Sequence, residues 1–283
     1  MSATRLVRPG SLAEALALLE GEPGARCLAG GATLVAMMNA GLVEPGLLVA
    51  LDGLAELRGI TAKPDGGLRI GAMTRHRETA AEPRFAGTLA MIRQAAGVIA
   101  NAVVRNMGTM GGSIAFADPA ADYPPALVAA DAEIEIAGSS GGRRLPARGF
   151  FHDWYTTALA PGEIVAAIHL PAPGPQPSLY RKHARTSGDF AIASIALALT
   201  ADRAGVRVAI GGCGPVPLRL DAAEETLTGR LGDAAAVAAA GSLLAEAADP
   251  VDDVRGSADY RRRLIPRLLA AGLAELRQAR EAA

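Results

Sequence analysis

Two glycine-rich stretches hold the residues of this chain whose types and spacing could bind a phosphate-bearing ligand. The first reads AGGAT at 29–33, and the second reads GTMGGSIAFADPAADYPP at 108–125. Glycine lets main-chain N–H groups approach a ligand closely, and successive N–H groups that point inward form a nest for an anion. If such a stretch opens onto a helix, the helix dipole also favours phosphate. The two stretches therefore indicate an anion site made of backbone.

The second stretch also brings polar side chains to its bare backbone. Thr109 precedes the glycines, and Ser113, Asp118 and Asp122 follow them within a few residues. A diphosphate next to a polyol needs this mixture of hydroxyl donors and carboxylate acceptors. Glycine is also the default residue of tight turns. Residue chemistry alone therefore leaves two alternatives, a phosphate-bearing cofactor or a pair of ordinary turns.

Other motifs of cofactor and catalytic sites are absent from the sequence. There is neither a G-x-G-x-x-G after a strand nor a G-x-x-x-x-G-K-[ST], and no G-x-S-x-G elbow of a hydrolase is present. A structural zinc site or an iron–sulfur cluster takes about four ligands. The available side chains lack such spacing, and they are His76, His152, His169, His183, Cys27 and Cys213. We predict no metal site and no catalytic side chain in this chain.

Composition excludes several classes of protein. The chain has 283 residues with a formal net charge of -1; half of them are hydrophobic and a fifth are charged. A substantial core can form, and the basic footprint of a nucleic-acid binder is missing, with Arg261, Arg262 and Arg263 expected on a solvated helix face. No apolar run reaches the roughly 18 residues of a membrane span. The start MSATRLVRPG lacks the apolar centre of a secretory signal, so we expect a cytoplasmic location.

The elements around the first glycine stretch follow from caps and periodicity. A helix begins at Ser11, which forms a capping box with Glu14. The short apolar run at 25–31 predicts a strand that ends in the glycine pair, and 32–41 predicts a helix with Thr33 as its cap. The local order is strand, glycine loop, helix.

The rest of the chain divides at a proline-rich linker, LPAPGPQPS at 170–178. Before the linker, hydrophobic periodicity predicts strands at 47–51, 68–72 and 163–171, helices from Thr74 and over 87–100, and a helix then a strand over 124–138. After it, the pattern predicts strands at 178–185, 191–201 and 205–212 and helices from Asp221 onward, the last capped by Ser257. A larger mixed domain therefore precedes a smaller one made of a sheet and helices.

AGGATL at 29–34 and RNMGTMGGSIAFADPAADYP at 105–124 together resemble the FAD-binding medium subunit of the molybdenum hydroxylases, the family of carbon monoxide dehydrogenase and xanthine dehydrogenase. IGAMT, EIVAAIHLP, YRKHARTSGDFAIAS and AIGGCGPVPLRL follow in the expected order, so the resemblance covers nearly the whole chain. It implies an α+β fold. A p-cresol methylhydroxylase-type FAD-binding domain, 1–172, would consist of subdomains at about 1–55 and 56–172. A small C-terminal domain, 178–283, would contain a three-stranded antiparallel sheet with helices.

The resemblance also assigns cofactor contacts to individual residues. It places backbone amides at the FAD diphosphate in a first loop, Ala29, Gly30, Gly31, Ala32, Thr33 and Leu34, and in a second loop, Thr109, Gly111, Gly112 and Ser113. Asp122 would accept from cofactor hydroxyls, and Ile99 and Ala100 would pack near the adenosine or the flavin. Ile164 or Val165 would contact the isoalloxazine, Lys182 would lie near its carbonyl edge, and Phe190 would cover a flavin face.

Three residues depart from the family pattern. Ala32 lacks the side-chain donor that relatives often carry, Ser113 replaces an asparagine found in some members, and Phe190 stands where many bacterial relatives have tyrosine. The first loop must therefore rely on its backbone, and Phe190 can cover a ring but cannot hydrogen-bond. Lys182 has an alternative role as a solvated strand lysine.

The resemblance implies an oxidoreductase that works by electron transfer. FAD in this chain would receive electrons from two [2Fe-2S] clusters on a small subunit and pass them to an external acceptor. A large subunit would hold the molybdenum cofactor and oxidise the substrate, and the complex would be a dimer of heterotrimers. Two other functions stay open. One is a binding or assembly protein that keeps the fold without turnover, and the other is a stand-alone flavin oxidase.

Overall fold

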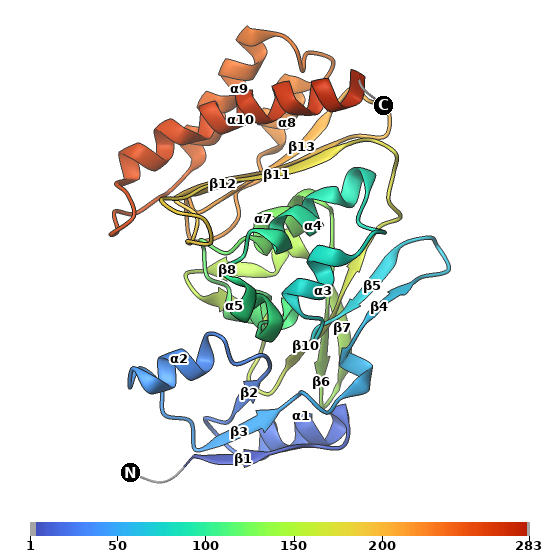
Figure 1. Cartoon of the computed structure of the whole chain (residues 1–283), viewed down its shortest axis with the longest axis vertical. Helices are drawn as coiled ribbons and strands as arrows, with labels where there is room; N and C mark the ends of the chain where they lie inside the picture. The colour runs from blue at the N-terminus through green and yellow to red at the C-terminus, as the bar shows by residue number, and fades with distance from the viewer. Residues whose placement is uncertain (1–3, 282–283) are drawn as a thin grey trace.

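The computed structural model describes residues 4–281, so the outermost residues of the two expected domains lie outside the described part. Figure 1 shows three main sheets arranged along the long axis of the molecule, with helices packed between and around them. A three-stranded sheet lies at the N-terminal end, a five-stranded sheet in the middle and a second three-stranded sheet at the C-terminal end. This mixed architecture confirms the expected α+β fold class.

The N-terminal sheet is short and parallel. Its strands are β1 (Arg5–Val7), β3 (Leu47–Ala50) and β2 (Arg26–Leu28), in that spatial order. Helix α1 (Leu12–Gly21) packs its buried Ala15 and Leu16 against this sheet. Ser11 caps it by accepting the N–H of Glu14 at 3.2 Å, but the Glu14 carboxylate accepts from Gly10 instead of Ser11. Only half of the predicted capping box therefore forms.

Helix α2 (Leu34–Asn39) follows the first glycine stretch, as predicted, but Thr33 does not cap it. Thr33 has φ -95° and ψ -53°, which is already helical, and its hydroxyl makes no cap hydrogen bond. A capping side chain reaches the N–H groups of the first turn from an extended backbone. The predicted role of Thr33 as a cap is wrong.

The middle sheet is antiparallel, and β10 is its central strand. Its order is β4 (Ile60–Ala62), β5 (Leu68–Gly71), β10 (Ile164–Leu170), β6 (Glu133–Gly138) and β7 (Gly141–Pro146). Every residue of β10 is buried, which matches its continuous apolar run. Strands β4 and β7 were not predicted, because β4 has only three residues and β7 is mostly polar, and each forms a strand by pairing with β5 or β6.

Helices cover one side of this sheet and carry the second glycine stretch. They are α3 (His76–Ala81), α4 (Ala90–Gly97), α5 (Ala102–Met107), α6 (Met110–Phe116) and α7 (Tyr123–Ala129). Short 3-10 turns, η1 (Ala55–Leu57), η2 (Gly87–Leu89) and η3 (Ala147–Gly149), and a hairpin of β8 (Phe151–Asp153) and β9 (Thr156–Thr157) complete this part. The predicted second loop is not a loop beyond Thr109, because Gly111, Gly112 and Ser113 form the first turns of α6. Because glycine has a low helix propensity, the sequence did not predict helix α6.

The C-terminal sheet has strands β11 (Ser178–His183), β12 (Ala193–Leu199) and β13 (Val206–Gly211), all antiparallel. Helices α8 (Asp221–Leu227), α9 (Ala234–Ala247) and α10 (Ala258–Glu281) cover one face, and α7 lies against the other (Figure 1). Along β12, Ile195 and Leu197 face the helical side, while Ala196 and Ala198 join the core of the middle part. The predicted three-stranded antiparallel sheet is confirmed.

Helix α10 begins where it was predicted, but one of its arginines, Arg261, is buried. Ser257 caps it by accepting the N–H of Tyr260 at 3.2 Å. Arg261 was expected to be solvated, yet only 4% of its surface is exposed. Its guanidinium donates to the carbonyl oxygens of Ile192 and Gly212, which lie at the ends of β12 and β13. The expectation of a solvated Arg261 is wrong because these carbonyl groups lie where the sequence cannot place them.

Candidate cofactor site

A cavity of about 600 Å³ lies among the N-terminal sheet, the helices of the middle part and the edge of the C-terminal sheet. Its size is in the usual range of cofactor sites, roughly 300–1,000 Å³. All of the residues assigned to FAD by resemblance lie in its wall, although the first and the last of them, Ala29 and Phe190, are 161 positions apart in the chain. The structure therefore brings the whole predicted set together, and their contact with FAD stays a prediction.

The first glycine stretch presents unpaired backbone to this cavity. Among residues 4–281, the N–H groups of residues 30–34 donate to no main-chain carbonyl. Gly31 has φ +73°, a left-handed conformation that glycine adopts without strain. A run of unpaired N–H groups in a partly buried loop needs an external acceptor. This backbone fits an anionic group such as the FAD diphosphate.

Gly30 in the first stretch and Gly111 in the second have no room for a side chain, because other parts of the chain lie against them. A Cβ added at Gly30 would collide with the carbonyl oxygen of Met107, just ahead of the second stretch. A Cβ added at Gly111 would collide with Ala72, whose carbonyl oxygen accepts the Gly111 N–H at 2.8 Å. The side-chain oxygen of Thr109 accepts the N–H of Gly112 at 3.1 Å and caps α6. The lack of side chains at Gly30 and Gly111 therefore allows neighbouring segments of the cavity wall to pack closely together.

Asp122 and Lys182 form a buried ion pair in the wall of the cavity. Lys182 Nζ lies 3.1 Å from the Asp122 carboxylate, and their side chains are 7% and 6% exposed. Asp122 also accepts from the hydroxyl of Tyr180 at 2.7 Å, and Lys182 donates to the carbonyl oxygen of Val98 at 2.8 Å. Burial raises the pKa of Asp122, and the charge of Lys182 opposes that rise. The alternative of a solvated Lys182 is wrong.

The cavity wall also includes His76 and Tyr155, which no sequence pattern singled out as cofactor contacts. His76 is 5% exposed, and its Nδ1 lies 3.1 Å from the hydroxyl of Tyr123. Burial and the nearby charge of Arg105 lower the pKa of His76 from 6.5 to about 4, so its ring is neutral near pH 7. Tyr155 has φ +52°, which is strained for a residue with a side chain, and its ring stands edge-on to Phe116. A lone histidine and a turn tyrosine carry no sequence signal.

The described residues contain neither a metal cluster nor a membrane span. Residues 4–281 include no group of three or more His, Cys, Asp or Glu side chains placed to hold a metal ion. Within the same range, no helix has the length and apolar character needed to cross a bilayer. The cytoplasmic location stays a prediction.

Comparison with known families covers almost the whole chain. Residues 2–173 match the family described as the FAD binding domain in molybdopterin dehydrogenase. Residues 178–276 match the CO dehydrogenase flavoprotein C-terminal domain. The chain belongs to the FAD-binding medium subunits of the molybdenum hydroxylases. FAD is therefore the cofactor of this medium subunit, and the predicted family and cofactor are confirmed.

Individual relatives of this medium subunit agree over most of its length. The glyceraldehyde dehydrogenase medium chain of Sulfolobus acidocaldarius is 34% identical over 262 residues, which is 92% of this chain and 93% of the relative. The carbon monoxide dehydrogenase medium chain of Hydrogenophaga pseudoflava is 35% identical over 260 residues, covering 89% and 90%. These names confirm the predicted oxidoreductase class and a place in a multi-subunit enzyme.

Solved structures give the same result for the fold of the medium subunit. A chain of the Cu,Mo-CO dehydrogenase in its cyanide-inactivated form superposes with a TM-score of 0.91 at 33% identity, covering 96% of both chains. A chain of quinoline 2-oxidoreductase from Pseudomonas putida 86 gives a TM-score of 0.91 at 30% identity, covering 98% of both. Agreement at this level over both parts of the chain confirms the fold predicted by resemblance.

Proposed function

We propose that this medium subunit holds FAD in the cavity and passes electrons from the iron–sulfur clusters of a small partner subunit to an external acceptor. The molybdenum cofactor would lie on a large partner subunit that oxidises the substrate. One observation supports the proposal above others: both glycine stretches, the Asp122–Lys182 pair and Phe190 wall one cavity. The dimer of heterotrimers is proposed from the family resemblance alone, and the cytoplasmic location from the lack of an apolar signal segment in MSATRLVRPG.

The division of the chain is part of the same proposal. An FAD-binding domain would span 1–172, with subdomains at about 1–55 and 56–172, and a C-terminal flavoprotein domain would span 178–283. The irregular segment between β10 and β11 supports a boundary at the proline-rich linker. Since Lys182 and Phe190 both line the cavity, the second domain would complete the cofactor site of the first.

The residues of this chain bind and orient the cofactor in the proposed mechanism. When bound, FAD supplies the electron-accepting and electron-donating chemistry that no side chain here provides. The unpaired N–H groups of 30–34 would hold the diphosphate, and Asp122 would accept from cofactor hydroxyls. Lys182 would place positive charge beside the flavin carbonyl edge, held there by Asp122 and by the carbonyl oxygen of Val98. Because Asp122 neutralises part of that charge, Lys182 would affect the flavin less than a lysine without an acidic partner would.

The direct test is the flavin content of the purified full-length chain. We expect the absorption of oxidised FAD at close to one FAD per chain, and loss of that absorption on reduction. No FAD after reconstitution would contradict the proposal and favour an assembly protein without turnover. Oxidation of substrates by the isolated chain, without partner subunits, would instead favour a stand-alone flavin oxidase.

Asp122→Ala tests the polar side of the proposed site. We expect FAD to bind about tenfold or more weakly, because a charge-assisted acceptor is lost and the buried Lys182 is left without its partner. Asp122→Asn keeps the shape of the side chain, and Asp259→Ala removes an exposed carboxylate in the first turn of α10 as a matched control. Isothermal titration calorimetry gives the affinities. An unchanged affinity for FAD in both Asp122 variants would remove this residue from the site.

A further inference from the structure

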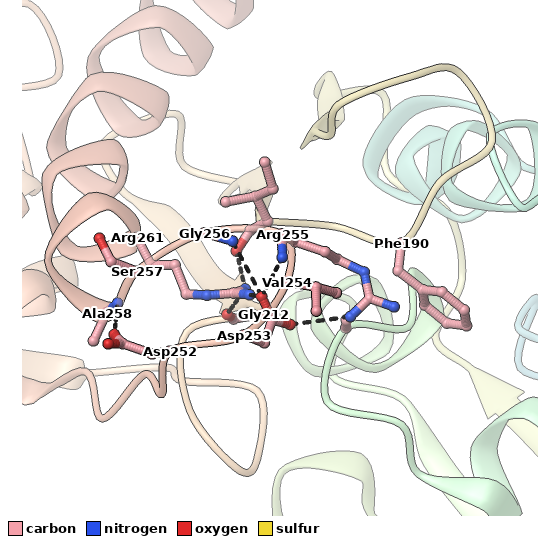
Figure 2. A network of polar contacts seen from close by, with 12 residues as sticks. Phe190, Gly212, Asp252, Asp253, Val254, Arg255, Gly256, Ser257, Ala258 and Arg261 are labelled. Carbon is pink, nitrogen blue, oxygen red and sulfur yellow. Dashed lines mark hydrogen bonds and ion pairs between the residues drawn. The ribbon is translucent and has the colours of Figure 1, made fainter.

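The segment between α9 and α10 is built around one carboxylate. Asp253 accepts from the N–H groups of Arg255 at 2.8 Å and Gly256 at 3.1 Å. It also accepts from the Arg261 guanidinium at 2.5 Å, and Figure 2 shows Asp253 at the centre of these contacts. Arg261 in turn donates to the carbonyl oxygens of Ile192 and Gly212. The segment is therefore fixed to the sheet end that faces the cofactor cavity.

Arg255 extends from this fixed segment toward the rim of the cavity. Its Nη1 donates to Asp253 at 3.0 Å, which sets the direction of its side chain. The guanidinium carbon lies 5.2 Å from the centroid of the Phe190 ring, which is a cation–π distance. Figure 2 shows the two side chains next to each other. Its Nε lies 3.8 Å from the Asp189 carboxylate and has no hydrogen-bond partner in the described part of the chain. Arg255 thus contacts two consecutive residues of the cavity wall.

The wall segment that Arg255 contacts is also held by Arg185, which donates to the Asp189 carboxylate at 3.0 Å, and by its own backbone. Gly188 has φ +83° and passes so close to Ala100 that an added Cβ would lie 2.6 Å from the Ala100 carbonyl oxygen. Two residues later, Phe190 is 44% exposed. A ring with that much exposure has fewer packing contacts to hold it than a core side chain has. The cation over its face adds a restraint.

We propose that Arg255 is a positioning residue that holds the Phe190 ring at the rim of the cavity before the cofactor binds. The inference rests on the proposed function, in which Phe190 covers a flavin face. A ring already ordered in the free protein loses less conformational entropy when the ligand arrives, so the ligand binds more tightly. The residue that carries the effect lies 65 positions beyond the ring in the chain.

A fluorine label reports on the ring without any cofactor. The full chain contains five phenylalanines, so 4-fluorophenylalanine gives a simple spectrum in which Phe190→Leu identifies the resonance of Phe190. In Arg255→Met we expect that resonance to move toward the solvent-exposed value. Arg255→Lys, which keeps a cation, should restore part of the shift. Arg262→Met, which removes a half-exposed arginine of α10, is the matched control and should leave the resonance in place. An unmoved resonance in Arg255→Met overturns the proposal.

A double-mutant cycle measures the consequence for FAD. We expect Arg255→Met to weaken FAD binding by about two- to tenfold, the cost of ordering one side chain on binding. The same change in a Phe190→Ala background should have no further effect, because the ring that Arg255 positions is gone. An equal loss in both backgrounds would show that Arg255 acts on the cofactor or on the fold directly, and would overturn the proposal.

The two measurements separate this proposal from the proposed function. If the wild-type chain binds no FAD, the proposed function fails, while the fluorine spectra still decide whether Arg255 orders the ring. If wild type and Arg262→Met bind FAD equally and Arg255→Met does too, the function stands and the positioning role is overturned. Arg255→Gln, which removes the charge but keeps a polar side chain, covers the case in which Arg255→Met does not fold, and an unmoved Phe190 resonance in it would also overturn the proposal.

Discussion

At the scale of single residues, Gly111 has no room for a side chain. An added methyl would press on Ala72, whose carbonyl oxygen would lie 2.8 Å from the new Cβ. We expect Gly111→Ala to lower the free energy of unfolding by about 1–3 kcal/mol, as overpacked sites do, and to weaken FAD binding because α6 must shift. Gly97→Ala at the end of α4 is the control, since nothing lies within 4 Å of its added Cβ. Urea unfolding measures both, and equal losses would contradict the packing argument.

His76 gives a second prediction at this scale, on pH. Its pKa is about 4 in the folded protein against 6.5 when unperturbed, so the unfolded chain binds more protons between these values. The contribution of the neutral ring to the free energy of unfolding is fully present above pH 6.5 and is lost as pH falls through 4. The total loss between pH 6.5 and pH 4 is about 3 kcal/mol. Urea unfolding at pH 7 and pH 4.5 should show a smaller loss for His76→Gln than for wild type. Equal losses would mean that this ring is not buried neutral.

At the scale of elements, α6 depends on its cap and its packing. Gly111 and Gly112 lower its intrinsic helix propensity, each by roughly 0.5–1 kcal/mol relative to alanine. Thr109 offsets part of this by accepting the N–H of Gly112. We expect Thr109→Val to lower the free energy of unfolding by about 1 kcal/mol, and Thr109→Ser to lower it much less because the hydroxyl remains. If thermal or urea unfolding ranks the two variants alike, the cap does not stabilise α6.

At the scale of the whole molecule, the cavity joins distant parts of the chain. Because its wall includes residues of β11 and of the segment before β12, FAD should stabilise both parts together. At a free FAD concentration 100-fold above Kd we expect about 2.7 kcal/mol, or roughly 5–10 °C in Tm. Fluorescence of the single tryptophan, Trp154, reports on the middle part, and hydrogen exchange in α10 reports on the C-terminal helices. A rise confined to Trp154 would show that the C-terminal part unfolds independently.

Much of the fold could be predicted from local sequence, because the signals act within a few residues. Ser11 and Ser257 cap helices as expected, and the apolar runs of β10 and β12 became buried strands. Elements without a local signal escaped prediction. The glycines of α6 and the polar residues of β7 adopt their structures through partners elsewhere in the chain, Ala72 for the helix and β6 for the strand.

For the candidate site, the sequence by itself determined which residues were available: two glycine stretches, a carboxylate, a lysine and an aromatic ring in a family order. Only the tertiary structure decided how they are used. It paired Lys182 with Asp122, placed Arg255 on Phe190, and showed that Gly30 and Gly111 stay bare because other backbone touches them. Caps and periodicity link residues within a turn or two, so they can be read along the chain. Ion pairing, close packing and burial link residues that meet only when the chain folds.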